Sequence, residues 1–179
     1  MEKNLTHIAL FAALIAVLGL VPKIDLAAGV PITAQSMGIM LCGTVLGAKR
    51  GALAVLLFLV VGLIVPVFPG FTTTWQKIQS PSIGYVIGFP IAAFVAGLIT
   101  QNTKLALFPA AFAGAIIGGI VVLYAFGIPG MAIMLEKPLP DMALAAAAFL
   151  PGDLIKAVLA ALITKSIAQM RPEALLSRG

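Results

Sequence analysis

The sequence predicts an all-α, polytopic integral membrane protein. Of its 179 residues, 61% are hydrophobic and only 9% are charged, whereas soluble domains carry about 25% charged residues. So few charges cannot cover a water-facing surface of this size, which excludes a soluble protein. The apolar residues also lie in long runs separated by prolines, glycine clusters and charges, the pattern of helices that cross the hydrocarbon core of a bilayer. The length fits a single membrane domain, residues 1–179.

The first three expected membrane helices are separated by one charged segment and by prolines. Residues 5–21 form an apolar run that starts after the charged N-terminus. Residues 35–48 form a shorter run that ends at the "GAKRG" segment (47–51), and residues 50–66 continue from there to a proline. Since a span needs about 20 apolar residues, we expect the second helix to be tilted or supported by its neighbours.

The other three expected helices are longer, and two of them contain helix-breaking residues. Residues 83–100 end at the polar "TQNTK" segment. Residues 104–127 contain a proline and a Gly-Gly pair, which predict a bend. Residues 141–168 contain Pro151, which removes one backbone hydrogen bond and predicts a kink. Together these runs predict a bundle of six transmembrane helices.

The charges are distributed unevenly between the two ends of these six helices. One end would carry seven basic and two acidic residues: Lys3, Lys49, Arg50, Lys104, Lys165, Arg171 and Arg178 against Glu2 and Glu173. The other end would carry three of each: Lys23, Lys77 and Lys137 against Asp25, Glu136 and Asp141. The positive-inside rule places the basic end in the cytoplasm. We therefore expect both termini to be cytoplasmic and the loops 22–34, 67–82 and 128–140 to face outward, and the net charge of +5 indicates topology rather than nucleic-acid binding.

The segment "FLPGDLIKAVLAA" places two opposite charges inside the last expected helix. Residues three apart share a helix face, so Asp153 and Lys156 would lie side by side just after the kink at Pro151. Charges inside membrane spans are costly and usually mark functional sites. The pair therefore indicates a ligand site at the floor of a cavity. An ion pair that only locks helix packing is the alternative.

The outward segments supply the polar and aromatic groups that such a cavity would need. Candidate ligand contacts are Thr33, Gln35, Thr73, Trp75 and Tyr85. Hydroxyl and amide groups offer neutral hydrogen bonds, while tryptophan and tyrosine offer a flat apolar face with a polar edge. Long loops often act as lids or binding loops. The alternative for the two aromatic residues is anchoring at the membrane interface.

The first helix carries two adjoining stripes of small residues. Ala9 and Ala13, and likewise Ala12 and Ala16, are four residues apart. Such stripes let another helix approach closely. Their spacing alone favours packing inside the bundle over contact with a partner.

Several motifs of enzymes and cofactor sites are absent from the sequence. It contains no GxxxxGK[ST] phosphate loop and no HExxH motif. It has one histidine and one cysteine, too few for a Ser/His/Asp set near the charged pair or for a metal cluster. We expect no enzymatic activity, no metal and no cofactor, so a nucleotide site for ATP-driven transport would belong to another chain.

Three stretches in order along the chain resemble the BioY family, the biotin-binding S-components of energy-coupling factor (ECF) transporters. They are "GVPITAQSMGIMLCGTVLGAKRG", "PSIGYVIGFPIAAFVAGLI" and "FLPGDLIKAVLAA". The resemblance implies a six-helix S-component in the cell membrane that captures biotin from outside with high affinity. It also implies a transmembrane T-component, contacted by the alanine stripes of the first helix, and two cytoplasmic ATPase subunits. The alternatives are an S-component for another vitamin and a scaffold subunit with a structural ion pair.

The chemistry of the charged pair suits biotin. A ureido ring has two N–H donors and one carbonyl acceptor, while an ionised Asp153 only accepts and Lys156 only donates. The pair adds no net charge to the pocket, and an unpaired buried ion would cost several kcal/mol. Gln35 or a loop threonine would add a neutral contact. Whether Lys156 instead binds the carboxylate of the biotin tail is left open by the sequence.

Overall fold

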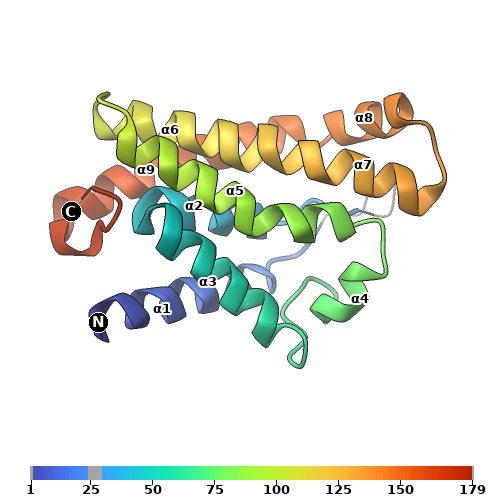
Figure 1. Cartoon of the computed structure of the whole chain (residues 1–179), viewed down its shortest axis with the longest axis horizontal. Coiled ribbons are helices and arrows are strands. Elements are labelled where there is room, and N and C mark those ends of the chain that lie inside the picture. Colours follow the sequence, from blue (N-terminus) through green and yellow to red (C-terminus); the bar gives the residue numbers. More distant parts are fainter. Residues whose placement is uncertain (1, 24–29, 179) are drawn as a thin grey trace.

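The structure is a computed structural model that describes residues 2–23 and 30–178, with the backbone alone for Glu2 and Lys3. Asp25, which entered the predicted charge balance, lies outside the described residues. The described chain is a bundle of helices (Figure 1), which confirms the all-α class. The elements are α1 (Glu2–Leu18), α2 (Gln35–Leu46), α3 (Ala48–Val61), α4 (Thr74–Ile78), α5 (Ile83–Asn102), α6 (Leu107–Ile116), the π-helical η1 (Ile117–Val122), α7 (Leu123–Leu135), α8 (Leu139–Ala147), α9 (Leu150–Met170) and the 3₁₀ turn η2 (Pro172–Ala174).

The described helices differ in whether each is long enough to cross a bilayer alone. Residues 83–102 and 107–135 are long and apolar enough, and α8 with α9 makes a third span if the bent pair is counted as one. The described part of α1 and all of α2 are apolar but shorter. Short helices cross only with tilt, local thinning or support from neighbours. The membrane class is therefore confirmed, whereas the count of six spans stays a prediction.

The helix predicted at 104–127 is longer than expected. It continues through α7 to Leu135, so the prediction of an outward loop at 128–140 is wrong for residues 128–135. Pro129 lies inside α7, so packing outweighs the low helix propensity of proline at this position. A Cβ on Gly130 would lie 2.6 Å from backbone atoms of Gly84, so the two glycines let α7 and α5 touch. That close crossing holds the end of α7 in helical form.

The bend expected at Gly118–Gly119 takes the form of a π-helical turn, η1. A Cβ on Gly118 would lie 2.4 Å from the carbonyl oxygen of Ala92, and one on Gly119 would lie 2.5 Å from the side chain of Met40. The glycine pair thus seats this helix directly on α5 and α2. In Figure 1, α6, η1 and α7 form one rod that lies along α5.

The kink predicted at Pro151 is confirmed. The span expected at 141–168 consists of α8 and α9, which meet at residues 148–149 with a bend of 55°. Pro151 lies in the first turn of α9, where a backbone N–H would have no partner inside the helix. Asp153 lies in the same turn. The carboxylate is therefore at the N-terminus of a helix, where the helix dipole stabilises negative charge.

The segment 67–82 is more ordered than an open loop. Helix α3 ends at Val61, earlier than the predicted boundary at residue 66. The chain then turns back onto the end of α3, where the backbone N–H of Thr74 donates to the carbonyl of Gly62 at 2.7 Å. Helix α4 then begins with a capping box: the Thr73 hydroxyl accepts from the backbone N–H of Gln76 at 3.3 Å, while the Thr73 N–H donates to the Gln76 side chain at 2.8 Å. This reciprocal pair satisfies two N–H groups at the helix start.

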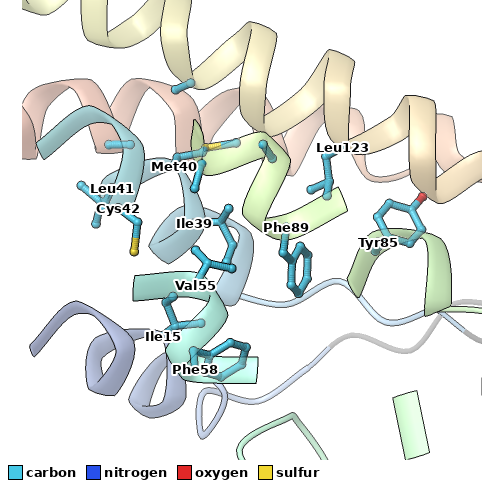
Figure 2. Close-up of a cluster of buried hydrophobic side chains, with 14 of the residues drawn as sticks. Ile15, Ile39, Met40, Leu41, Cys42, Val55, Phe58, Tyr85, Phe89 and Leu123 are labelled. Atoms are coloured by element: carbon cyan, nitrogen blue, oxygen red, sulfur yellow. The ribbon is translucent and has the colours of Figure 1, made fainter. Parts of the chain in front are cut away.

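The buried core lies where α1, α2, α3 and α5 meet. Figure 2 shows Ile15 of α1, Ile39 of α2 and Phe58 of α3 in this cluster, each at most 1% exposed. Phe89 and Tyr85 continue the cluster along α5 (Figure 2). Their position links the core to the cavity described below.

The start of α1, the turn between α2 and α3 and the C-terminal tail lie at one end of the bundle (Figure 1). The tail is tied down there. The Arg178 guanidinium donates to the carbonyls of Thr100 at 2.8 Å and Thr103 at 2.7 Å, at the end of α5. The backbone N–H groups of Leu176 and Ser177 both donate to the carbonyl of Val45 at 2.9 Å. Both ends of the described chain thus lie at the same end of the bundle, as an even number of membrane crossings requires. That this end faces the cytoplasm stays a prediction.

Candidate ligand-binding site

A partly open cavity of about 70 Å³ lies between the start of α2, α5, α7 and the start of α9. Its lining combines apolar and aromatic side chains with polar and charged ones. The lining residues are Val30, Pro31, Ile32, Thr33, Gln35, Ser36, Phe68, Pro69, Lys77, Ser82, Tyr85, Val86, Phe89, Leu123, Phe149, Asp153 and Lys156. Figure 2 shows Tyr85, Phe89 and Leu123, three of the apolar and aromatic lining residues, among the buried side chains of the core.

The predicted pair of charges lies in the wall of this cavity. Lys156 Nζ is 2.9 Å from Asp153 Oδ1, and the two residues lie one turn apart on α9. Ser36 on α2 completes a triangle, since its hydroxyl donates to Asp153 Oδ1 at 3.3 Å and accepts from Lys156 Nζ at 3.0 Å. Asp153 is 5% exposed. Because Asp153 and Lys156 both line the cavity, the pair borders a void and is not sealed inside the bundle.

Sequence reasoning missed the other partner of the carboxylate. The hydroxyl of Tyr124, on α7, donates to Asp153 Oδ2 at 2.8 Å. Its signal in the sequence is a tyrosine inside the apolar run "GGIVVLYAFG", because a buried phenol needs a hydrogen-bond partner. Nothing local in the sequence assigns that partner to a residue 29 positions away.

Gln35 holds the cavity wall together. Its side-chain N–H₂ group donates to the carbonyls of Ile15 at 3.1 Å and Val67 at 2.9 Å, so one amide joins α1, α2 and the segment after α3. Both donors are used, which leaves the amide oxygen as the atom that Gln35 can offer a ligand. Thr33 also lines the cavity, and its hydroxyl accepts from the backbone N–H of Gln35 at 3.3 Å.

Three aromatic rings pack together beside Asp153, and two of them, Tyr85 and Phe149, line the cavity. Tyr85 packs edge to face against Tyr124 and Phe149, with ring centres 6.5 and 6.1 Å apart, and Tyr124 packs against Phe149 at 6.5 Å. The Tyr85 hydroxyl lies 3.6 Å from the sulfur of Met131. Edge-to-face packing of this kind keeps rings in fixed orientations. The wall is therefore a shaped apolar surface next to a charged, hydrogen-bonded floor.

This combination suits a small ligand with a neutral polar head and an apolar body. A carboxylate that accepts and an ammonium that donates lie side by side, and their charges cancel. Among the described residues, no group of three His, Cys, Asp or Glu side chains lies close enough to hold a metal ion.

Comparison with known proteins identifies the family. Residues 2–173 match the sequence model of the BioY family. The chain belongs to the BioY family. It is 47% identical over 192 residues to the "Biotin transporter BioY" of Rhodobacter capsulatus, covering 100% of both chains. It is 43% identical over 173 residues to that of Rhizobium etli, covering 92% of each.

A solved structure supports the same assignment. The fold matches the crystal structure of "the S-component for biotin from an ECF-type ABC transporter" with a TM-score of 0.88 and 30% identity, over 94% of this chain and 92% of that one. The names of these relatives are those of transporter proteins, in agreement with the expectation that this BioY chain is not an enzyme.

The structure brings together five of the seven predicted ligand contacts of this BioY chain. Asp153, Lys156, Gln35, Thr33 and Tyr85 line the cavity. Two others do not. The Thr73 side chain caps α4, and Trp75 is 59% exposed on α4, so neither is part of the lining.

The same helix α4 contributes a residue that was not predicted. Lys77 lies two positions after Trp75 and lines the cavity. A five-residue helix places positions 75 and 77 on different faces, since each residue turns the chain by about 100°. To predict which of these two side chains points into the cavity, one would need to know at which residue α4 begins. The capping box at Thr73 sets that residue.

The alanine stripes of α1 divide into an outer and an inner pair. Ala9 and Ala13 are exposed, whereas Ala12 is buried and Ala16 is partly buried. The first stripe is therefore the more exposed of the two, and both of its alanines are available for contact with another helix.

Proposed function

We propose that this BioY protein captures biotin from outside the cell and delivers it across the membrane as the S-component of an ECF-type transporter. The observation that carries the proposal is the Asp153–Lys156 pair at the wall of a cavity. Relatives named as biotin transporters, and the similar S-component for biotin, support biotin over other small vitamins.

The polar groups at the floor match a ureido ring. One ring N–H would donate to the Asp153 carboxylate, and the ring carbonyl would accept from Lys156, which has three N–H donors. The amide oxygen of Gln35 would accept the second ring N–H. The apolar part of the ring system would pack on Tyr85 and Phe149. Because the floor is neutral overall, a neutral ring leaves no unpaired buried ion.

We assign the carboxylate of the biotin tail to Lys77. Lys156 donates to Asp153 and Ser36, and its third N–H would go to the ring carbonyl. Lys77 lines another part of the cavity, on α4. A second cation there would bind an anionic tail through a charge-assisted hydrogen bond. The ligand would thus have a neutral head and a negative tail.

Replacing Lys77 by glutamine tests this assignment. We expect the affinity for biotin to fall about tenfold, which corresponds to the roughly 1.4 kcal/mol lost with one charge-assisted contact. Biotin amide, whose tail is neutral, should bind the variant and the wild type equally well. Lys137→Gln removes an exposed lysine outside the lining and serves as the control in calorimetric titration. Equal losses for biotin and its amide would contradict the assignment.

The partners and the topology belong to the same proposal. We propose a transmembrane T-component that packs on the exposed stripe Ala9–Ala13, where small residues let helices approach closely, and two cytoplasmic ATPase subunits that supply the energy. Both termini would face the cytoplasm, with the cavity open toward the outer side of the cell membrane. Cysteine-accessibility labelling at each terminus would test this orientation.

Calorimetric titration of the purified protein with a panel of vitamins tests the function itself. We expect biotin to bind with submicromolar affinity and the other vitamins neither to bind nor to compete. Binding of a different vitamin without competition by biotin would point to an S-component of other specificity. No binding at all would leave a scaffold subunit with a structural ion pair.

A further inference from the structure

The carboxylate at the floor of the cavity is held from behind by a residue that does not touch the cavity. Tyr124 donates its hydroxyl to Asp153 Oδ2 at 2.8 Å, yet it is not among the residues that line the cavity. We infer that Tyr124 is a positioning residue that orients Asp153 for the ligand. This inference rests on the proposed function, since it concerns how the same site recognises a ureido ring.

The hydrogen bonds that Asp153 already accepts determine how many acceptor sites it can offer to the ligand. An ionised carboxylate has about four acceptor sites, two on each oxygen. Oδ1 accepts from Lys156 and from Ser36, and Oδ2 accepts from Tyr124. One acceptor site therefore remains, on Oδ2. The ligand can place one N–H on Asp153, and its second N–H needs another acceptor.

The bond from Tyr124 removes a freedom that the other contacts leave. The terminal torsion of an aspartate is broad, so two donors on Oδ1 alone do not fix where Oδ2 lies. A hydrogen bond from a hydroxyl to a charged oxygen is roughly twice as strong as one between two neutral groups. Since the Tyr124 ring is itself packed at 6.5 Å against Tyr85 and Phe149, its hydroxyl is a fixed anchor. Asp153 thereby offers its last acceptor site in one direction.

Tyr124→Phe removes the hydroxyl and keeps the ring. We expect the dissociation constant for biotin to rise about tenfold, because the acceptor site is no longer held in place. Two cyclic carbamate analogues of biotin, each with one ring N–H replaced by oxygen, add a selective readout. With the carbamate that lacks the N–H bound by Asp153, wild type and variant should differ by less than about twofold. With the other carbamate, the tenfold difference should remain.

Thr164→Val is the matched control. Thr164 on α9 shares a buried hydrogen bond of 2.8 Å with Thr44 on α2, and neither residue lines the cavity. Like Tyr124→Phe, the substitution Thr164→Val removes one hydroxyl that links α9 to a neighbouring helix. We expect the variant to unfold at a lower temperature and to bind biotin within twofold of the wild type.

Three results would overturn the inference. They are wild-type affinity of Tyr124→Phe for biotin, equal loss for biotin and both carbamates, and a Thr164→Val variant as impaired in binding as Tyr124→Phe. In each case the wild type would still bind biotin, so the proposed function would stand. Lack of biotin binding by the wild type would instead refute the proposed function.

A spectroscopic measurement covers the case in which Tyr124→Phe does not fold. The chain has two tyrosines, so labelling with 3-fluorotyrosine gives two fluorine resonances, which Tyr85→Phe assigns. We expect the Tyr124 resonance of the wild type to shift when biotin is added, since the ligand joins the same carboxylate. An unchanged Tyr124 resonance at saturating biotin would overturn the positioning role.

Discussion

Asp153→Asn is expected to lower the affinity for biotin by about 100-fold or more, which is roughly 2.7 kcal/mol of binding free energy. Asparagine replaces one carboxylate oxygen by an N–H₂ donor, although both oxygens accept hydrogen bonds here: Oδ1 from Lys156 and Ser36, and Oδ2 from Tyr124. The change also leaves Lys156 without its counter-ion in a setting where uncompensated charge costs about 3–5 kcal/mol. Calorimetric titration would measure the loss, and circular dichroism would show whether the helices persist.

Two further variants separate recognition from general charge effects. Asp141→Asn makes the same chemical change at an exposed position of α8 and should bind biotin like the wild type. The double variant Asp153→Leu/Lys156→Met removes both charges, which often leaves stability unchanged or improved. We expect it to fold and to fail to bind biotin. Wild-type binding by the double variant would reduce the pair to a structural ion pair.

Gly97→Ala is expected to cause a large loss of stability. A Cβ at this position of α5 would lie 2.3 Å from the backbone nitrogen of Ala48 and 2.4 Å from the carbonyl carbon of Gly47. Both neighbours are backbone atoms, so the turn between α2 and α3 would have to move away from α5. Gly47 itself has φ +83°, a conformation that favours glycine. Overpacking that forces the backbone to shift typically costs about 1–3 kcal/mol and occasionally more.

Gly152→Ala is the matched control for this prediction. Within 4 Å of a Cβ on Gly152 there is no atom that it would strike, and the residue lies in the first turn of α9. Alanine is the better helix former by about 1 kcal/mol. In detergent, thermal unfolding of Gly152→Ala should occur at or above the wild-type temperature, and that of Gly97→Ala well below it. Similar midpoints for the two variants would contradict the close contact at Gly97.

The predictions that succeeded concern features encoded in short stretches of the chain. The shortage of charge excluded a soluble fold whatever the topology, and the three-residue spacing brought Asp153 and Lys156 into contact because neighbours on a helix face are fixed by helix geometry. The kink at Pro151 follows from the proline itself, which cannot continue the hydrogen-bond ladder of α8 but fits the first turn of a new helix. The family resemblance rests on the order of whole motifs, and the comparisons confirm it.

The failures concern features that depend on contacts between distant segments. The extension of α7 beyond Pro129 depends on the fit of Gly130 against Gly84. The exposure of Trp75 depends on where α4 starts and how it docks on α3.

By itself, the sequence determined the membrane class, the all-α fold, the family and the charged pair, because composition and helix periodicity act locally. Tertiary structure alone decided which polar side chains border the cavity and that Tyr124 of α7 holds the carboxylate of α9. The physical reason is that a hydrogen bond between two helices depends on their crossing and rotation, which arise from the packing of the whole bundle.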